Sequence, residues 1–242
     1  MPDRRSHRGP HPEDARLFAP EQWAALRAAT RDLSWLLERG YQLASALKLS
    51  GDRYALTARQ RAAVARCACA DSTARARRAR LQPLSALAGA RLAIDGFNVL
   101  TTLEVAISGG VVLLGRDGVL RDIAGVHGSY RSVEETEPAL ALLERTLRAS
   151  GVASCEWLLD APVSNSGRLC ALINARGVAG WQARVVPDPD PLLAHASAVV
   201  ASADGEVLDA AAQSCNLARL CVERELPDAR LVDLSGDPAQ AP

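Results

Sequence analysis

Four aspartates stand where short apolar runs of the sequence end, and their carboxylates could bind a metal ion together. They are Asp95, Asp160, Asp190 and Asp204, which follow the runs Leu92–Ile94, Trp157–Leu159, Ala183–Val186 and Val199–Ala201. Because ligands of open α/β sheets bind beyond the carboxyl ends of the strands, we expect these side chains to share one edge. Oxygen ligands suit Mg²⁺ or Mn²⁺, and such sites activate water for attack on phosphodiesters. The alternative is that the aspartates are caps and turn residues that never meet.

Two polar residues beside these aspartates could complete the site. Asp95-Gly-Phe-Asn98 places an amide three residues after the first aspartate, and Gly96 lets the chain turn sharply there. Asn98 either caps the following helix or orients a ligand. Ser202, two residues before Asp204, adds a hydroxyl at the end of another strand.

A segment rich in hydroxyl and amide groups, Ser164-Asn-Ser-Gly-Arg168, follows Asp160 and opens a helix. Backbone amides at a helix N-terminus favour anions, and an arginine in the first turn adds a cation for a phosphate. Ser164, Asn165 and Arg168 are therefore predicted to contact the backbone of a nucleic acid. Simple capping of the helix is the alternative.

Residues 110–123 form two apolar arms around Asp117-Gly118, a pattern typical of a β-hairpin. A polar segment punctuated by glycines follows, and it carries His127, Tyr130 and Arg131. This loop could cover a site and turn these three side chains toward a substrate. The alternative is a hairpin that only decorates an edge of the sheet.

The elements that must position these residues alternate between short apolar runs and helical patterns, which predicts βα units and a mainly parallel sheet. The expected strands are Leu92–Ile94, Cys155–Leu159, Ala183–Val186, Val199–Ala201 and Arg230–Val232. The expected helices are residues 133–149, 168–176, 192–196 and 207–224.

The first 80 residues differ from the rest of the chain in composition and periodicity. Residues 1–19 have no period and are predicted to be a disordered leader, and residues 20–80 are predicted to form a small helical domain. Pro20 and Thr57 mark helix starts. Residues 59–80 are rich in arginine, which could track phosphates, although a charge run is more often a solvated face.

The overall composition excludes some classes. The net charge is zero, so no global field attracts nucleic acid, and the 48% hydrophobic content suffices for a core. The six cysteines lack zinc-ligand spacing, which indicates free thiols in a reducing cytoplasm. The sequence has no signal peptide and no apolar run long enough to span a membrane.

Three motifs together resemble the PIN-like superfamily of metal-dependent ribonucleases, including its NYN branch. They are Asp95-Gly-Phe-Asn98, Asp190-Pro-Leu-Leu-Ala-His-Ala and Val199-Val-Ala-Ser-Ala-Asp204, and the resemblance covers roughly residues 88–236. It implies that Asp95, Asp190 and Asp204 bind the metal and that Ser202 assists. The whole chain resembles an uncharacterised prokaryotic family that joins a helical domain to a PIN-like one.

The sequence departs from the superfamily in two places. The superfamily usually has an acid after the first strand, and here Glu104, Glu134 and Glu135 compete for that role. The hairpin and the Ser164–Arg168 segment are not general features of the superfamily.

We therefore expect an α/β protein with a three-layer α/β/α PIN-like domain, a hairpin insertion and a small all-α domain before it. The expected function is a cytoplasmic Mg²⁺- or Mn²⁺-dependent nuclease acting on RNA, with Asp160 as a further acid. Because PIN-like proteins often pair, a homodimer is a candidate assembly. The main alternative is a non-catalytic nucleic-acid-binding or adaptor protein, and a small-molecule phosphohydrolase is a third hypothesis.

Overall fold

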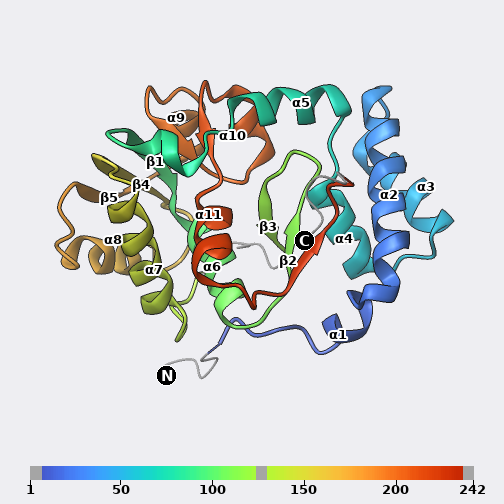
Figure 1. Ribbon diagram of the computed structural model, residues 1–242, viewed down its shortest axis with the longest axis horizontal. Helices are drawn as coiled ribbons and strands as arrows, with labels where there is room; N and C mark the ends of the chain where they lie inside the picture. Colours follow the sequence, from blue (N-terminus) through green and yellow to red (C-terminus); the bar gives the residue numbers. More distant parts are fainter. Residues whose placement is uncertain (1–6, 124–129, 237–242) are drawn as a thin grey trace.

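The computed structural model describes residues 7–123 and 130–236, and its centre is a five-stranded parallel sheet (Figure 1). The strand order is β5-β4-β1-β6-β7, and every neighbouring pair is parallel. The strands are β1 Arg91–Asp95, β4 Ser154–Asp160, β5 Trp181–Val186, β6 Val199–Ala201 and β7 Ser214–Cys215. The chain runs outward from β1 through β4 to β5 and then returns to the other side of β1 as β6. The strand order thus reverses between β1 and β6.

Helices cover both faces of this sheet, which gives the three α/β/α layers. Alternate residues of β1 point to opposite faces, as in any strand. Leu92 and Ile94 pack with α6, α7, α8 and α11, whereas Ala93 packs with residues of α9 and α10. These helices are α6 Gly96–Ile107, α7 Thr136–Ala149, α8 Ser166–Ala175, α9 Asp190–Ala194, α10 Gly205–Ala210 and α11 Leu217–Glu225. Burial on both faces explains why the central strands β1 and β6 are continuous apolar runs rather than alternating ones.

The predicted hairpin belongs to a second, three-stranded sheet. Its strands β2 Val112–Leu114 and β3 Leu120–Asp122 pair antiparallel, and β2 also pairs in parallel with β8 Leu231–Asp233 near the C-terminus. Strand β8, expected in the main sheet, is therefore in a different one. The hairpin is therefore not a decoration on an edge of the main sheet. Most of the loop that was expected to cover a site falls outside the described residues.

The helical front region shares a hydrophobic core with this second sheet. Its elements are α1 Asp14–Leu17, α2 Pro20–Glu38, α3 Leu43–Arg53, α4 Ala58–Cys67 and α5 Asp71–Arg80, and a 3-10 turn Leu84–Leu87 leads into β1. Leu26 and Leu33 of α2 lie in one buried cluster with Leu113 and Val232 of the second sheet. Figure 1 shows β2 and β3 between these helices and the main sheet. The front helices thus bury their apolar face against strands from the rest of the chain.

Two predictions about order and helix length were wrong. Residues 7–19, expected to be disordered, are packed: Phe18 is buried, and Asp14 accepts a hydrogen bond from Arg59 Nη2 at 2.8 Å. A four-residue helix is too short to show a period in the sequence. Residues 207–224, expected as one helix, are α10, β7 and α11, because a two-residue strand joins the sheet edge between two shorter helices.

Most arginines of the arginine-rich run have partners within the molecule, although only Arg77 is buried. Arg59 pairs with Asp14, Arg61 with Asp52, and Arg77 with Asp117 and Asp209. Most of the run therefore does not form the phosphate-tracking face that the sequence suggested. No helix within the described residues is long and apolar enough to cross a membrane.

Candidate active site

An acidic pocket of about 250 Å³ opens beyond the carboxyl ends of the central strands. It lies where the strand order reverses, between β1 and β6, the position at which open α/β sheets bind ligands. All four predicted aspartates line it. The lining residues are Arg66, Asp95, Phe97, Asn98, Thr101, Asp122, Asp160, Val163, Asp190 and Asp204.

Asp95 is the most buried of the four aspartates, with 6% of its surface exposed. It is the last residue of β1 and the N-cap of α6, and it accepts a hydrogen bond from the Asn98 backbone amide at 3.3 Å. Its second oxygen accepts from the Ser202 hydroxyl at 2.8 Å. Burial, Asp190 and Asp160 nevertheless raise the pKa of Asp95 to about 7. The carboxylate is thus held in place by two hydrogen bonds, while burial and its acidic neighbours disfavour its ionised form.

Gly96 allows α6 to pack close to β4. A Cβ atom there would lie 2.5 Å from the Leu159 side chain and 3.1 Å from the Leu158 carbonyl oxygen. This glycine was predicted to allow a sharp turn, but close approach of the backbone to β4 is what requires it.

Asn98 and Ser202 hold the loop after β6 against α6. Asn98 does not cap the helix, because Asp95 does; its side-chain oxygen accepts from the Ala203 backbone amide at 3.0 Å. The Ser202 hydroxyl, which donates to Asp95, accepts from the Asp204 amide at 3.0 Å. Asp204 in turn caps α10 through one oxygen, which accepts from Glu206 and Val207. Asp204 therefore both caps α10 and lines the pocket, two roles that were expected to exclude each other.

Asp160 and Asp190 complete the acidic wall. Asp160 is the last residue of β4, and Asp190 is the first residue of α9. Burial and the charges of Asp204, Asp188 and Asp160 raise the pKa of Asp190 to about 6. Burial and Asp188 also raise the pKa of Asp160. Carboxylates that share a pocket in this way repel one another in their ionised forms.

The donor set of the pocket fits a hard cation such as Mg²⁺ or Mn²⁺, because it consists of carboxylate and amide oxygens without sulfur or imidazole. Among the described residues, however, no three acidic, histidine or cysteine side chains form a ready-made metal-binding group. The pocket therefore offers the ligand chemistry of such a site without a closed coordination cage.

Two charged lining residues were not predicted from the sequence. Asp122 ends the second arm of the hairpin, is 6% exposed and accepts from the Thr102 hydroxyl at 3.0 Å. Arg66 comes from the last turn of α4 in the front region. The only available signal was the position of Asp122 at a strand end, and nothing local marks Arg66 among its neighbouring arginines.

The Ser164–Arg168 segment is not part of the pocket. Asn165 takes a left-handed conformation with φ 69° and donates from its amide to the Tyr130 carbonyl at 2.8 Å. The neighbouring Ser166 hydroxyl donates to the Asp160 and Val163 carbonyls. Ser164 and Arg168 are exposed and lie outside the lining. This turn connects β4 to α8, but its side chains do not cap the helix as the capping alternative expected, because the N-cap residue Asn165 makes no side-chain capping hydrogen bond.

The remaining predicted residues lie elsewhere or outside the described part of the chain. His127 falls outside the described residues. Arg131 is exposed and does not line the pocket, and its carbonyl accepts from Arg8 at 3.4 Å. Tyr130, expected to face a substrate, is buried and donates to Glu104 at 2.5 Å. Glu104, one of the three competing acids, is thus used in the core, and the acid that reaches the pocket is Asp122.

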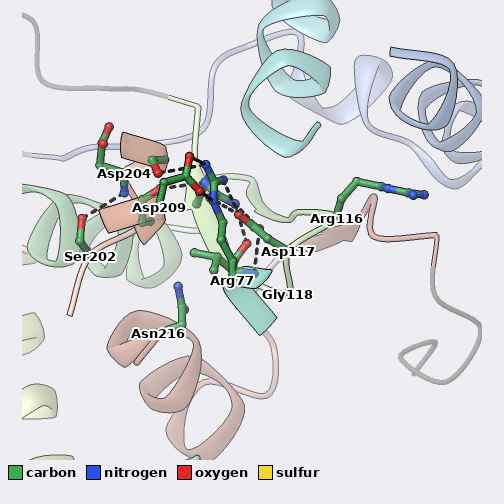
Figure 2. A network of polar contacts seen from close by, with 12 residues as sticks. Arg77, Arg116, Asp117, Gly118, Ser202, Asp204, Asp209 and Asn216 are labelled. Carbon is green, nitrogen blue, oxygen red and sulfur yellow. Dashed lines mark hydrogen bonds and ion pairs between the residues drawn. The ribbon is translucent and has the colours of Figure 1, made fainter. Parts of the chain in front are cut away.

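Two buried arginines hold the backbone on either side of Asp204. Arg121 of β3 donates to the Ala203 carbonyl and Arg77 of α5 donates to the Gly205 carbonyl, both at 2.9 Å. Asp117 lies between the two guanidiniums, accepting from Arg121 at 2.7 Å and from Arg77 at 2.9 Å. Figure 2 shows Arg77 between Asp117 and Asp209, with Ser202 and Asp204 beside them. We call Arg77, Asp117 and Arg121 the arginine clamp.

Comparisons with known proteins match the front helical region and the α/β region to two different families. Residues 84–220 match the family described as Domain of unknown function (DUF5616), and residues 25–80 match the one described as Protein of unknown function (DUF434). The chain is 32% identical to the Uncharacterized protein MJ0935 of Methanocaldococcus jannaschii over 152 residues, which cover 63% of this chain and 73% of that relative. No solved structure matches the chain.

Proposed function

The chain belongs to the DUF5616 family, whose matched segment holds all four predicted aspartates, and we propose that it is a metal-dependent nuclease acting on RNA. The observation that carries the proposal is the pocket at the strand-order reversal, lined by Asp95, Asp122, Asp160, Asp190 and Asp204. Carboxylates crowded in this way repel one another unless they are protonated or neutralised by a cation. The choice of RNA and of a PIN-like fold rests on the sequence resemblance.

In this proposal Asp95, Asp190 and Asp204 hold Mg²⁺ or Mn²⁺, and Asp160 and Asp122 add negative charge around them. The metal would supply a Lewis acid for the phosphoryl oxygens and a water molecule of lowered pKa. Ser202 and Asn98 act as positioning residues, because their hydrogen bonds fix Asp95 and the loop that carries Asp204. A cytoplasmic location, which we also propose, is supported by six cysteines that are all free.

A non-catalytic nucleic-acid-binding or adaptor protein is the second candidate. It is favoured by one observation, that the described carboxylates do not form a ready-made metal group. Such a protein would bind RNA without metal-dependent cutting.

The two candidates are separated by cleavage of labelled single-stranded, hairpin and duplex RNAs in Mn²⁺, Mg²⁺ or EDTA. We expect cutting that needs metal and is lost in Asp95→Asn and Asp204→Asn. Asp228→Asn makes the same change at an exposed aspartate outside the pocket and serves as the control. Cutting that survives both pocket substitutions, or RNA binding without any cutting, would contradict the nuclease.

A further inference from the structure

Arg66 is the one cationic residue among the described residues that line the acidic pocket. It is exposed and lies in the last turn of α4, facing a lining whose other charged members are all aspartates. It is contributed by the front helical region, whereas every other lining residue belongs to residues 95–204. The pocket is therefore completed by two parts of the chain that match different families.

The guanidinium of Arg66 forms no hydrogen bond or ion pair within the described part of the chain. Its neighbours in the arginine-rich run behave differently: Arg59 pairs with Asp14, and Arg61 pairs with Asp52. An unpaired guanidinium beside several carboxylates has its donors available for an anion that enters the pocket.

The backbone that carries Arg66 is firmly held. Thr57 caps the start of α4 in a capping box with Gln60. At the other end Cys67 is buried, and its carbonyl accepts from the Arg116 amide of the hairpin at 2.8 Å. The position of Arg66 relative to the hairpin is thus fixed, while its long side chain is free to reach a ligand.

We propose that Arg66 binds a phosphate group of the RNA that enters the pocket, so that α4 forms one wall of the substrate site opposite the strand ends. This inference rests on the proposed function. Arginine is suited to the contact because its planar donors match phosphate oxygens in pairs. A purely structural alternative is that Arg66 is a counter-ion that relieves the repulsion among the carboxylates.

The test compares wild type, Arg66→Ala and Arg75→Ala in two assays. Arg75 is the control because it is an exposed arginine of the next helix that does not line the pocket. RNA affinity is measured in EDTA, where no metal-dependent cutting occurs, at several salt concentrations. Steady-state cleavage in Mn²⁺ then gives KM and kcat separately, and melting temperatures report folding.

We expect Arg66→Ala to weaken RNA binding and raise KM by roughly 10- to 100-fold, as for loss of a charged hydrogen bond. The slope of log affinity against log salt should fall by about 0.7 for a single strand. The melting temperature should stay unchanged, and Arg75→Ala should resemble wild type. Unaltered affinity and KM in Arg66→Ala, or a lower melting temperature in EDTA with RNA affinity intact, would overturn the phosphate contact.

The outcome for the nuclease can be read independently. If wild type and Arg66→Ala cut RNA equally well in the presence of metal, the result would support the nuclease and contradict the role of Arg66. If RNA binding depends on Arg66 but no RNA is cut, the result would contradict the nuclease and support a phosphate contact in an RNA-binding protein. Absence of both binding and cutting in wild type would end both.

Discussion

Asp95 combines a structural role with an unfavourable charge. Its two oxygens tie β1 to α6 and to the loop after β6. Burial and neighbouring carboxylates raise its pKa from 3.8 to about 7, which corresponds to roughly 4 kcal/mol of disfavoured ionisation. The residue thus holds the site together while its ionised form destabilises the metal-free fold.

The pH dependence of stability follows from this shift. Between about pH 4 and pH 7 folded Asp95 keeps a proton that the unfolded chain has released. The metal-free free energy of unfolding should therefore fall as pH rises through this window and stay level above it. Asp95→Asn should flatten this dependence and raise the free energy of unfolding at pH 8 by about 2 kcal/mol. The full 4 kcal/mol is not expected, because the substitution also alters two hydrogen bonds. Urea unfolding in EDTA at pH 5 and pH 8 measures both effects.

Adding Mn²⁺ at pH 8 should raise the melting temperature of wild type, because a ligand that binds the folded state stabilises it. It should have little effect on Asp95→Asn, and Asp228→Asn should respond as wild type does. An equal Mn²⁺ response in all three proteins would place any bound metal outside this pocket.

At the scale of elements, the arginine clamp links α5, the hairpin and α10 around Asp204. Arg121 is 6% exposed and Arg77 is 9% exposed, and Asp117 is the carboxylate that both contact. The two guanidiniums lower the pKa of Asp117 to about 2 although burial opposes them. The hairpin therefore acts as a support for the loop that carries a proposed ligand.

Asp117→Asn should be strongly destabilising, because it leaves two buried guanidiniums without their shared carboxylate. We expect a loss of about 3–5 kcal/mol in the free energy of unfolding at pH 7. Asp71→Asn is the matched control: it removes a more exposed partner of Arg116 and should cost less than about 1 kcal/mol. Denaturant unfolding measures both variants. Similar losses in the two would show that the clamp is not a special support.

At the scale of the whole molecule, the front helices and the α/β region depend on each other. Leu113 and Val232 of the second sheet, with Val111 and Leu234 beside its strands, are buried in the core that α1 to α4 complete. The family boundaries near residues 80 and 84 thus separate two stretches of sequence but not two independent cores.

A chain that comprises only residues 88–236 should consequently fold poorly. Removal of the front helices exposes these four apolar residues and leaves Asp117 without its contact to Arg77. We expect binding of a hydrophobic dye and a broad, low-temperature thermal transition, with the full chain as the control. A cooperative transition at the temperature of the full chain would mean that the α/β region is autonomous.

Local patterns of the sequence determined the elements that carry the four aspartates. The apolar runs of the sequence became β1, β4, β5 and β6, and Thr57 and Pro20 start helices as predicted. Because parallel strands present their carboxyl ends at one edge, the strand predictions favoured the convergence of the four aspartates over caps that never meet. Asp190 and Asp204 reach the pocket from helix starts just beyond these strand ends.

Only the tertiary structure decided which distant residues join them. The pairing of β2 with β8, the burial of Arg77 and the arrival of Asp122 and Arg66 at the pocket all depend on packing between segments far apart in the chain. Periodicity and capping report a residue's immediate neighbours, so an arginine that pairs with a buried carboxylate looks the same in sequence as one that faces a ligand. Arg77 and Arg66 differ in their surroundings, because the fold places Asp117 beside Arg77 and places Arg66 at the acidic pocket.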